Sequence, residues 1–179
     1  QPHVVARESS QPHVVAWGYV QLSIWGKVIA KVSSKVSVLI HDDQAQVVGG
    51  KQIKVRLKTS KEWCDYYGVD VKKGIVILYK GVNDDYSTQK GVFYTPGSIP
   101  KAPDWDGGKA ECGGGLHFSP CVSGTLQFRT DAHRFIACPV CIKDFKPFEN
   151  AQYPDKIKAP GCCAPVWEVD RNGEKVEPQ

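Results

Sequence analysis

An eight-residue apolar repeat near the N-terminus constrains the fold of this chain more than any other feature. The block QPHVVA occurs at 1–6 and again at 11–16, and after it apolar residues recur every eight positions. Apolar and polar residues alternate within each unit, as they do in strands. Gly, Ser and Lys between the units indicate turns. The columns with this spacing are Val20, Val28 and Val36; Leu22, Ala30 and Val38; and Ile24, Val32, Ile40 and Val48.

Short repeated strands cannot bury their apolar sides alone, and stacking of successive units solves this problem. The repeat therefore predicts an N-terminal β-solenoid of eight-residue repeats over residues 1–58, with a meander of hairpins as the alternative. The alternating run at 53–57 is expected to be a capping strand. The first unit would present an uncapped stack, so we expect further repeats before Gln1. For the same reason we expect self-association or protein contacts through residues 1–20.

The repeat arm is basic, with eight Lys or Arg against three Asp or Glu in residues 1–58. Such a balance is typical of segments that bind nucleic acid or anionic surfaces. The alternative is that Lys27, Lys31 and Lys35 solvate turns and block pairing at strand edges. Both interpretations stay open at the level of the sequence.

Residues 59–179 have the pattern of a small mixed α+β domain, so the whole chain is expected to be mainly β, a β-rich α+β protein. A helix is predicted to begin at the Thr59 cap, with Glu62 completing the cap, and to end at Gly68. A long loop is predicted at 98–111, and 123–128 is compatible with a short helix or a strand. Strands are predicted at 74–79, 91–94, 116–119, 134–140 and 166–169.

The densest group of chemically useful residues lies between Glu111 and Pro120. Gly113, Gly114 and Gly115 permit close approach of the backbone to a ligand. On a strand, His117 and Ser119 would face the same side. A cysteine nucleophile with a histidine base is a further possibility, with Cys112 or Cys163 beside His117 or His133.

Six of the seven cysteines lie between 112 and 163. Cys138-Pro-Val-Cys141 has the spacing of a zinc knuckle, and either Cys162 with Cys163 or Cys112 with His117 would complete four ligands. Against this, neighbouring side chains on a strand point to opposite faces. Buried reduced thiols and disulfides are the alternatives.

The segments EWCDYYGV, ILYKGVNDDY, YTPGSIPKAPDWDGGKAECGGGLHFSP, RFIACPV and APGCCAPVWEVD resemble a family of actinobacterial and actinophage proteins. Members of that family carry short β-repeats ahead of a Cys-rich domain with the GGGLHFSP segment. The resemblance covers nearly the whole chain, and it implies a host-bacterial or phage-encoded protein without implying an activity.

The C-terminal domain also shows a distant similarity to ADP-ribosyltransferase-like folds. This resemblance implies Lys80, at the end of a first strand, as the basic residue, with His117 and Ser119 beside the nicotinamide and Glu168 as the acid. In such an enzyme, NAD or another nucleotide would lie near Gly113, Gly114 and Gly115, and Tyr94 could stack on a base or nicotinamide. The chain departs from the pattern in having Lys at position 80, where Arg or His is usual, and in lacking Ser-Thr-Ser and Glu-x-Glu motifs.

Three functions follow from these features. The first is a structural or interaction protein whose solenoid presents a C-terminal binding domain. The second is an ADP-ribosyltransferase-like enzyme acting on NAD or another nucleotide, and the third is a nucleic-acid binder using the basic arm. We expect no cofactor by default, with zinc and NAD as alternatives. Without a visible signal peptide or a long apolar run, a cytoplasmic location and no membrane contact are expected.

Overall fold

The computed structural model describes residues 3–6, 13–17, 20–41, 43–148, 151 and 153–176, with the backbone alone for 3–6 and 13. The chain forms two compact units. The first is Gln1–Leu57 with Glu149–Pro154, and the second is Lys58–Phe148 with Asp155–Gln179. Much of the segment 1–20, through which self-association was expected, lies outside the described residues. No helix within the described part is long and apolar enough to cross a bilayer.

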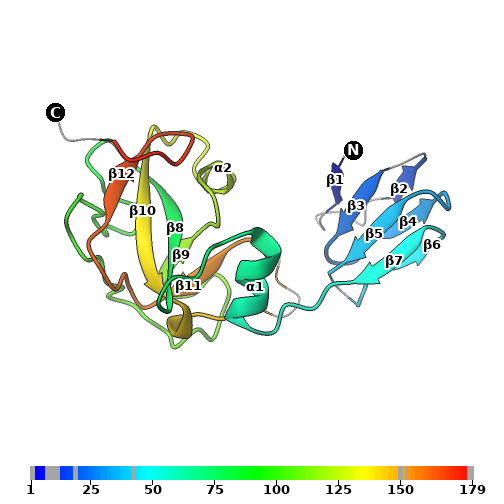
Figure 1. Cartoon of the computed structure of the whole chain (residues 1–179), viewed down its shortest axis with the longest axis horizontal. Helices are drawn as coiled ribbons and strands as arrows, with labels where there is room; N and C mark the ends of the chain where they lie inside the picture. The colour runs from blue at the N-terminus through cyan, green and yellow to red at the C-terminus, as the bar shows by residue number, and fades with distance from the viewer. Residues whose placement is uncertain are drawn as a thin grey trace. The chain divides into compact units, whose positions relative to one another are not determined.

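The first unit consists of two sheets, each built of parallel strands (Figure 1). Successive strands of the chain belong alternately to one sheet and to the other. One sheet has the order β1-β3-β5-β7 and the other β2-β4-β6. Their bounds are β1 His3–Ala6, β2 His13–Ala16, β3 Gln21–Ile24, β4 Ile29–Val32, β5 Ser37–Ile40, β6 Gln46–Val48 and β7 Lys51–Lys54. Successive strands therefore enter different sheets, and each strand pairs with the strand two places further along.

The pairing revises the eight-residue columns expected from the sequence. Leu22 is paired with Val38 and Ile24 with Ile40, so hydrogen-bonded equivalents are two repeats apart. Ala30, an intermediate member of one column, lies in the other sheet and is paired with Val14 and Val47. The apolar members of both sheets form one buried cluster, made of Leu22, Ile24, Val28, Ala30, Val32, Val36, Val38 and Ile40. The eight-residue interval is thus the distance along the chain between successive strands, which alternate between two sheets that share one core.

The last strand of the first unit begins earlier than the run at 53–57 predicted. β7 spans Lys51–Lys54, pairs in parallel with β5, and has all four residues exposed. Residues 55–58 have no regular secondary structure. The strand thus completes the sheet by backbone pairing while its side chains remain in water.

The second unit has a three-stranded antiparallel sheet of order β12-β10-β8 at its centre (Figure 1). The strands are β8 Ile75–Val82, β10 Arg134–Cys141 and β12 Trp167–Val169. A second pair consists of β9 Leu116–Phe118 and β11 Ile157–Ala159. A bridge between Tyr79 and Ser119 connects β8 to the end of β9, with N···O distances of 2.9 and 3.0 Å. The domain is therefore mainly β, with two short α-helices among the described residues.

Helix α1 (Ser60–Tyr67) confirms the predicted capping box. The Thr59 hydroxyl accepts a hydrogen bond from the Glu62 amide at 3.2 Å, and the Glu62 carboxylate accepts one from the Thr59 amide at 2.9 Å. Gly68 ends the helix with φ +67°. Trp63 is fully buried and packs edge-on against Phe145, with the ring centroids 5.8 Å apart. The cap thus begins a helix whose anchor in the core is Trp63.

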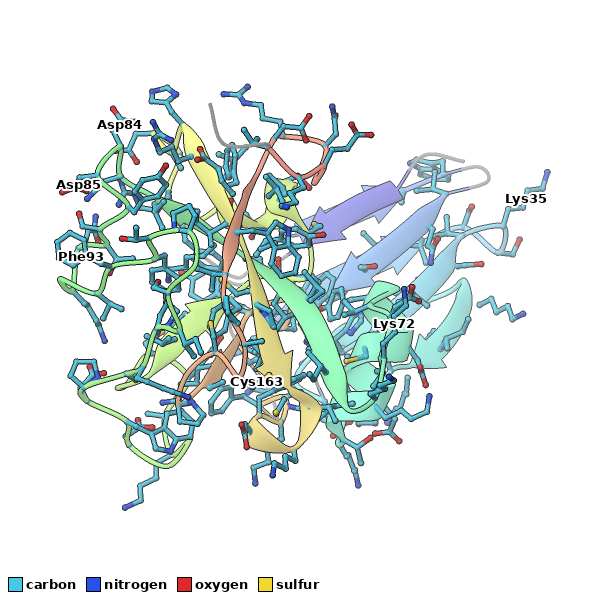
Figure 2. All side chains as sticks on the ribbon, turned by 60° about the vertical axis from the view of Figure 1, so that its left-hand side comes forward. Lys35, Lys72, Asp84, Asp85, Phe93 and Cys163 are labelled. Atoms are coloured by element: carbon cyan, nitrogen blue, oxygen red, sulfur yellow. The ribbon has the colours of Figure 1, made fainter. Side chains whose placement is uncertain are left out.

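Other predicted elements are confirmed or revised. The strands predicted at 74–79, 116–119, 134–140 and 166–169 correspond to β8, β9, β10 and β12. The segment 123–128, for which helix and strand were both open, overlaps helix α2 (Val122–Thr125). A 3₁₀ turn follows β10 at Ile142–Asp144. The prediction of a strand at 91–94 is wrong, because Phe93 makes only an isolated bridge to Ser87. Phe93 instead points outward from the loop that follows β8 (Figure 2).

We expect Thr59→Ala to lower the free energy of unfolding of the second unit by about 1 kcal/mol, because the Glu62 amide loses its acceptor. Thr59→Ser keeps the hydroxyl and serves as the matched control. Urea unfolding followed by tryptophan fluorescence measures both. Equal stability of the two variants would show that the cap contributes nothing.

Candidate functional site

The second unit contains a pocket of about 590 Å³ where several segments distant in sequence meet. Its lining comes from β8, β9, the loop 88–94, the loop 103–115, the end of α2 with the residues after it, and Lys156 just before β11. The β8–β9 bridge at Tyr79 and Ser119 forms part of this lining. Pockets that hold small molecules are commonly 300–1,000 Å³. The pocket is thus of a size that accommodates a metabolite.

Strand pairing places two predicted site residues side by side in the pocket. Lys80 comes from β8 and His117 from β9, and the Lys80 ammonium donates a 2.9 Å hydrogen bond to the His117 carbonyl oxygen. The Lys80 Nζ atom also lies 6.0 Å from the centroid of the Tyr94 ring. His117 Nε2 lies 3.2 Å from the Glu111 carbonyl oxygen. Both side chains are therefore held by backbone groups.

The pocket is strongly cationic. Its described lining includes four basic side chains, Lys80, Lys90, Arg129 and Lys156, and a single carboxylate, Asp104. Asp104 is already engaged, since it accepts from the Gly115 amide at 3.0 Å and lies 3.4 Å from the Lys90 ammonium. Positive charge gathered in a concave, partly desolvated site attracts anions.

The pKa values of two residues in the pocket reflect this environment. The pKa of Lys80 is lowered to about 8, mainly by burial, with smaller contributions from the nearby cations Lys90, Arg129 and Lys156 and an opposing effect of Cys138. Burial also lowers the pKa of His117 to about 4, with the Lys80 and Lys156 charges contributing next. At neutral pH, Lys80 is mostly charged and the His117 imidazole is neutral.

A buried ion pair fixes the loop that supplies one wall of the pocket. Lys158 on β11 has only 1% of its side chain exposed, and its ammonium donates to both carboxylate oxygens of Asp106, at 2.6 and 2.7 Å. It also donates to the Gly114 carbonyl oxygen at 3.0 Å. Because Asp106 and Gly114 lie on the two sides of the loop 103–115, this one ammonium joins both sides to β11.

The three glycines in this loop serve its internal packing. A Cβ added at Gly113 would overlap the Asp106 carboxylate, and one at Gly114 would overlap the Asp104 carbonyl oxygen. At Gly115, with φ +122°, it would meet the ring of Trp105. The glycines were expected to let a ligand approach the backbone. The structure gives another reason for glycine at these positions, because the neighbouring aspartates and tryptophan occupy the space that a side chain would need.

The structure gathers most of the residues expected at the site. The expected residues that line the pocket are Lys80, Tyr94, Gly115, His117 and Ser119. Gly113, Gly114 and Glu168 are not part of its lining. Glu168 is on β12, paired with Ile136, which on its other side is paired with Lys80. Glu168 and Lys80 thus face the same side of the sheet about 10 Å apart, two strand spacings. The Glu168 carboxylate instead accepts from Arg134 at 2.8 Å and from the Tyr86 hydroxyl at 2.9 Å.

The four cysteines expected to bind zinc form two pairs. Cys138 contacts Cys162, and both are fully buried; Cys141 contacts Cys163, and both are partly exposed. Cys163 lies beside the end of β10, and its amide donates to the Pro139 carbonyl oxygen at 2.9 Å (Figure 2). Burial, followed by the Cys141 contact, raises the pKa of Cys163 to about 11. Among the described residues, no three His, Cys, Asp or Glu side chains come together as metal ligands.

Several lining residues were not identified from the sequence. Arg129 follows α2 and donates to Asn83 at 2.6 Å and to Asp131 at 3.0 Å. Lys156 contacts the Cys112 sulfur at 3.2 Å and lies 5.4 Å from the Phe128 ring centroid. These side chains belong to unrelated local patterns, and no spacing rule connects them. Residues 80–158 carry eight Lys and two Arg against nine Asp and Glu, so composition gave no signal for a cationic pocket.

The basic residues of the repeat arm have a different distribution. Lys27 and Lys35 lie in turns, Lys31 lies on β4 in one sheet, and Lys51 and Lys54 lie on β7 in the other. Asp43 pairs with Lys54 at 3.5 Å and also with Arg56. The described lysines of the arm are therefore spread over turns and both sheets, without forming one stripe.

Comparison with known proteins identifies no relative: no protein-family model, curated protein or solved structure matches the chain.

We expect Gly114→Ala to destabilise the second unit by about 3 kcal/mol, the upper part of the range for overpacking, because the new methyl group meets a backbone oxygen. Gly91→Ala is the control, since an added Cβ there meets nothing within 4 Å and introduces only the strain of φ +74°, about 1 kcal/mol. Urea unfolding of both variants measures the difference. Equal losses would refute the packing explanation.

Loop anchoring also predicts a pH dependence. The hydrogen bond from Lys158 holds the pKa of Asp106 below its ordinary value of 3.8. Its contribution to stability is therefore complete above that value and is lost as the pH falls through the lower pKa of the folded state. Urea midpoints measured between about pH 5 and pH 2 should fall more steeply for the wild type than for Asp106→Asn. Parallel curves would contradict the assignment.

Proposed function

We propose that the second unit is a binding domain for a small organic anion, held in the pocket between β8, β9 and the loop 103–115. The single observation that carries this proposal is the excess of four basic side chains over one carboxylate in the described lining of a 590 Å³ pocket. A cluster of like charges repels itself and lowers stability unless a counter-charge is present. A bound anion would supply that counter-charge.

The aromatic lining favours an anion that also has a planar ring. Tyr94, Phe118 and Phe128 line the same pocket as the cations. Phosphate or carboxylate groups pair with Lys and Arg, while aromatic faces accommodate a base or another flat ring. A nucleotide combines both features and suits the pocket volume.

The transferase-like alternative is favoured by one observation, the meeting of Lys80, His117 and Ser119 in one pocket. It would require an acid beside the nicotinamide, and Glu168 is engaged by Arg134 and Tyr86 outside the described lining. We therefore propose binding as the primary function. NAD remains one of the nucleotides to be tested as a ligand.

For the repeat arm we propose a short β-solenoid of two strands per turn. The parallel pairing of alternate strands, with a register of sixteen residues between β3 and β5, supports this proposal. So does the shared apolar core between the sheets. In this proposal the arm is a structural element that precedes the binding domain in the chain.

Calorimetric titration with AMP, adenosine, inorganic phosphate and NAD tests the proposed pocket. We expect AMP to bind measurably more tightly than adenosine, because adenosine lacks the anionic group. Lys80→Gln and Lys156→Gln should each weaken AMP binding at least tenfold, a loss of about 1.4 kcal/mol. Lys35→Gln is the matched control, since Lys35 extends from a turn of the repeat arm (Figure 2). Equal affinity for adenosine and AMP, or equal effects of all three variants, would overturn the proposal.

The pKa of Lys80 predicts how binding varies with pH. The pKa of about 8 means that the ammonium is lost above pH 8 in the free protein. A phosphate ligand with its second pKa near 6 keeps a constant charge there. AMP affinity should therefore fall by up to about tenfold per pH unit above pH 8. Lys80→Arg keeps its charge, so its affinity should stay level over that range; an identical fall in the variant would exclude Lys80 as the titrating group.

A further inference from the structure

Lys80 differs from Lys90 and Arg129, two of the other pocket cations, in its surroundings. Lys90 lies near Asp104, and Arg129 donates to Asp131. In the described part of the chain, Lys80 has no carboxylate within ion-pair distance, and its ammonium donates to the backbone oxygen of His117. Its charge therefore receives no direct compensation from an acidic side chain. Charge that is uncompensated in this way favours the neutral amine.

A neutral amine in a pocket is a nucleophile. With a pKa of about 8, about half of the Lys80 side chains are uncharged at pH 8, whereas an ordinary lysine is almost entirely protonated. The groups that face Lys80 come from several elements. Burial is the largest cause of the lowered pKa, and the charges of Lys90 in the loop after β8, Arg129 after α2 and Lys156 before β11 act in the same direction. Cys138 on β10 opposes them, and the His117 carbonyl oxygen and the Tyr94 ring also face the Lys80 ammonium.

We infer that Lys80 forms an imine with a small aldehyde or ketone that also carries an anionic group. This inference rests on the proposed anion-binding function, because Lys90, Arg129 and Lys156 would hold the anionic group while Lys80 meets the carbonyl carbon. The lone pair of the Lys80 nitrogen forms the new C–N bond, and a proton moves from that nitrogen to the former carbonyl oxygen. Loss of this hydroxyl as water, with the second nitrogen proton, gives the C=N bond.

The step consumes one amine and one carbonyl group and produces one imine and one water, so it needs no oxidant or reductant. His117 lines the same pocket as a neutral imidazole at pH 7, a form able to accept a proton on one nitrogen and donate from the other. It is thus suited to move protons between the adding amine and the leaving hydroxyl. His117 would act as a proton carrier beside the covalent group.

Reductive trapping on the full chain tests the inference. The protein is incubated with pyridoxal 5′-phosphate, an aldehyde that carries a phosphate, then reduced with borohydride and mapped by peptide mass spectrometry. We expect adduct at Lys80 to exceed that at the exposed residues Lys35 and Lys72 at least tenfold. Pyridoxal without the phosphate should lose this preference, and excess AMP should abolish it. Labelling spread evenly over lysines, or concentrated at Lys90 or Lys156, would overturn the inference.

AMP binding and the pocket adduct are both measured on the wild-type chain, and this separates the inference from the proposed function. Lys80→Arg has no nucleophilic amine, so the pocket adduct should disappear in this variant. If the wild-type chain binds AMP but yields no adduct at Lys80, the imine inference alone is wrong. If the wild-type chain does not bind AMP, the anion-binding proposal itself is wrong. Because the adduct is mapped on the wild-type chain, a variant that fails to fold does not prevent the test.

Discussion

The buried ammonium group of Lys158 is the constraint on which the pocket of the second unit depends. A charge that is 99% removed from solvent is tolerated only when its hydrogen-bonding capacity is met. Asp106 and the Gly114 carbonyl meet it, and both belong to the loop 103–115. The loop must therefore stay close to β11, and that position brings Asp104, Cys112 and Gly115 into the pocket wall. The glycines at 113 and 114 follow from the same constraint, because the loop has no room for side chains there.

The charges that suit the pocket to binding an anion also lower the stability of the fold. Four basic side chains in one lining repel one another, and burial adds a desolvation cost that lowers the pKa of Lys80. Residues arranged in this way commonly mark a site of binding or chemistry. Asp104 offsets part of the repulsion near Lys90. A ligand that is anionic and able to react with an amine would use both the charge and the reactivity of the cluster.

Local patterns in the sequence predicted local structure well. The capping box of Thr59 and Glu62, the apolar run of β8 and the strand at 134–140 all depend on neighbouring residues, so they were readable in advance. β11 was missed because it is only three residues long and has a lysine at its centre, Lys158, whose burial depends on an aspartate 52 positions away. The predicted strand at 91–94 failed for the opposite reason, since Phe93 alternates correctly but finds no partner strand beyond one bridge.

The sequence by itself determined the two-part organisation of the β-structure: an apolar interval of eight that requires stacked strands, then a domain with its own buried strands and capped helix. Only the tertiary structure decided that alternate repeats enter different sheets, because the interval is the same for one sheet or two. It also decided which polar residues meet. Lys80, Lys90, Arg129 and Lys156 converge through pairing of β8 with β10 and β9 and through folding of the loops, and such long-range contacts leave no periodic trace along the chain.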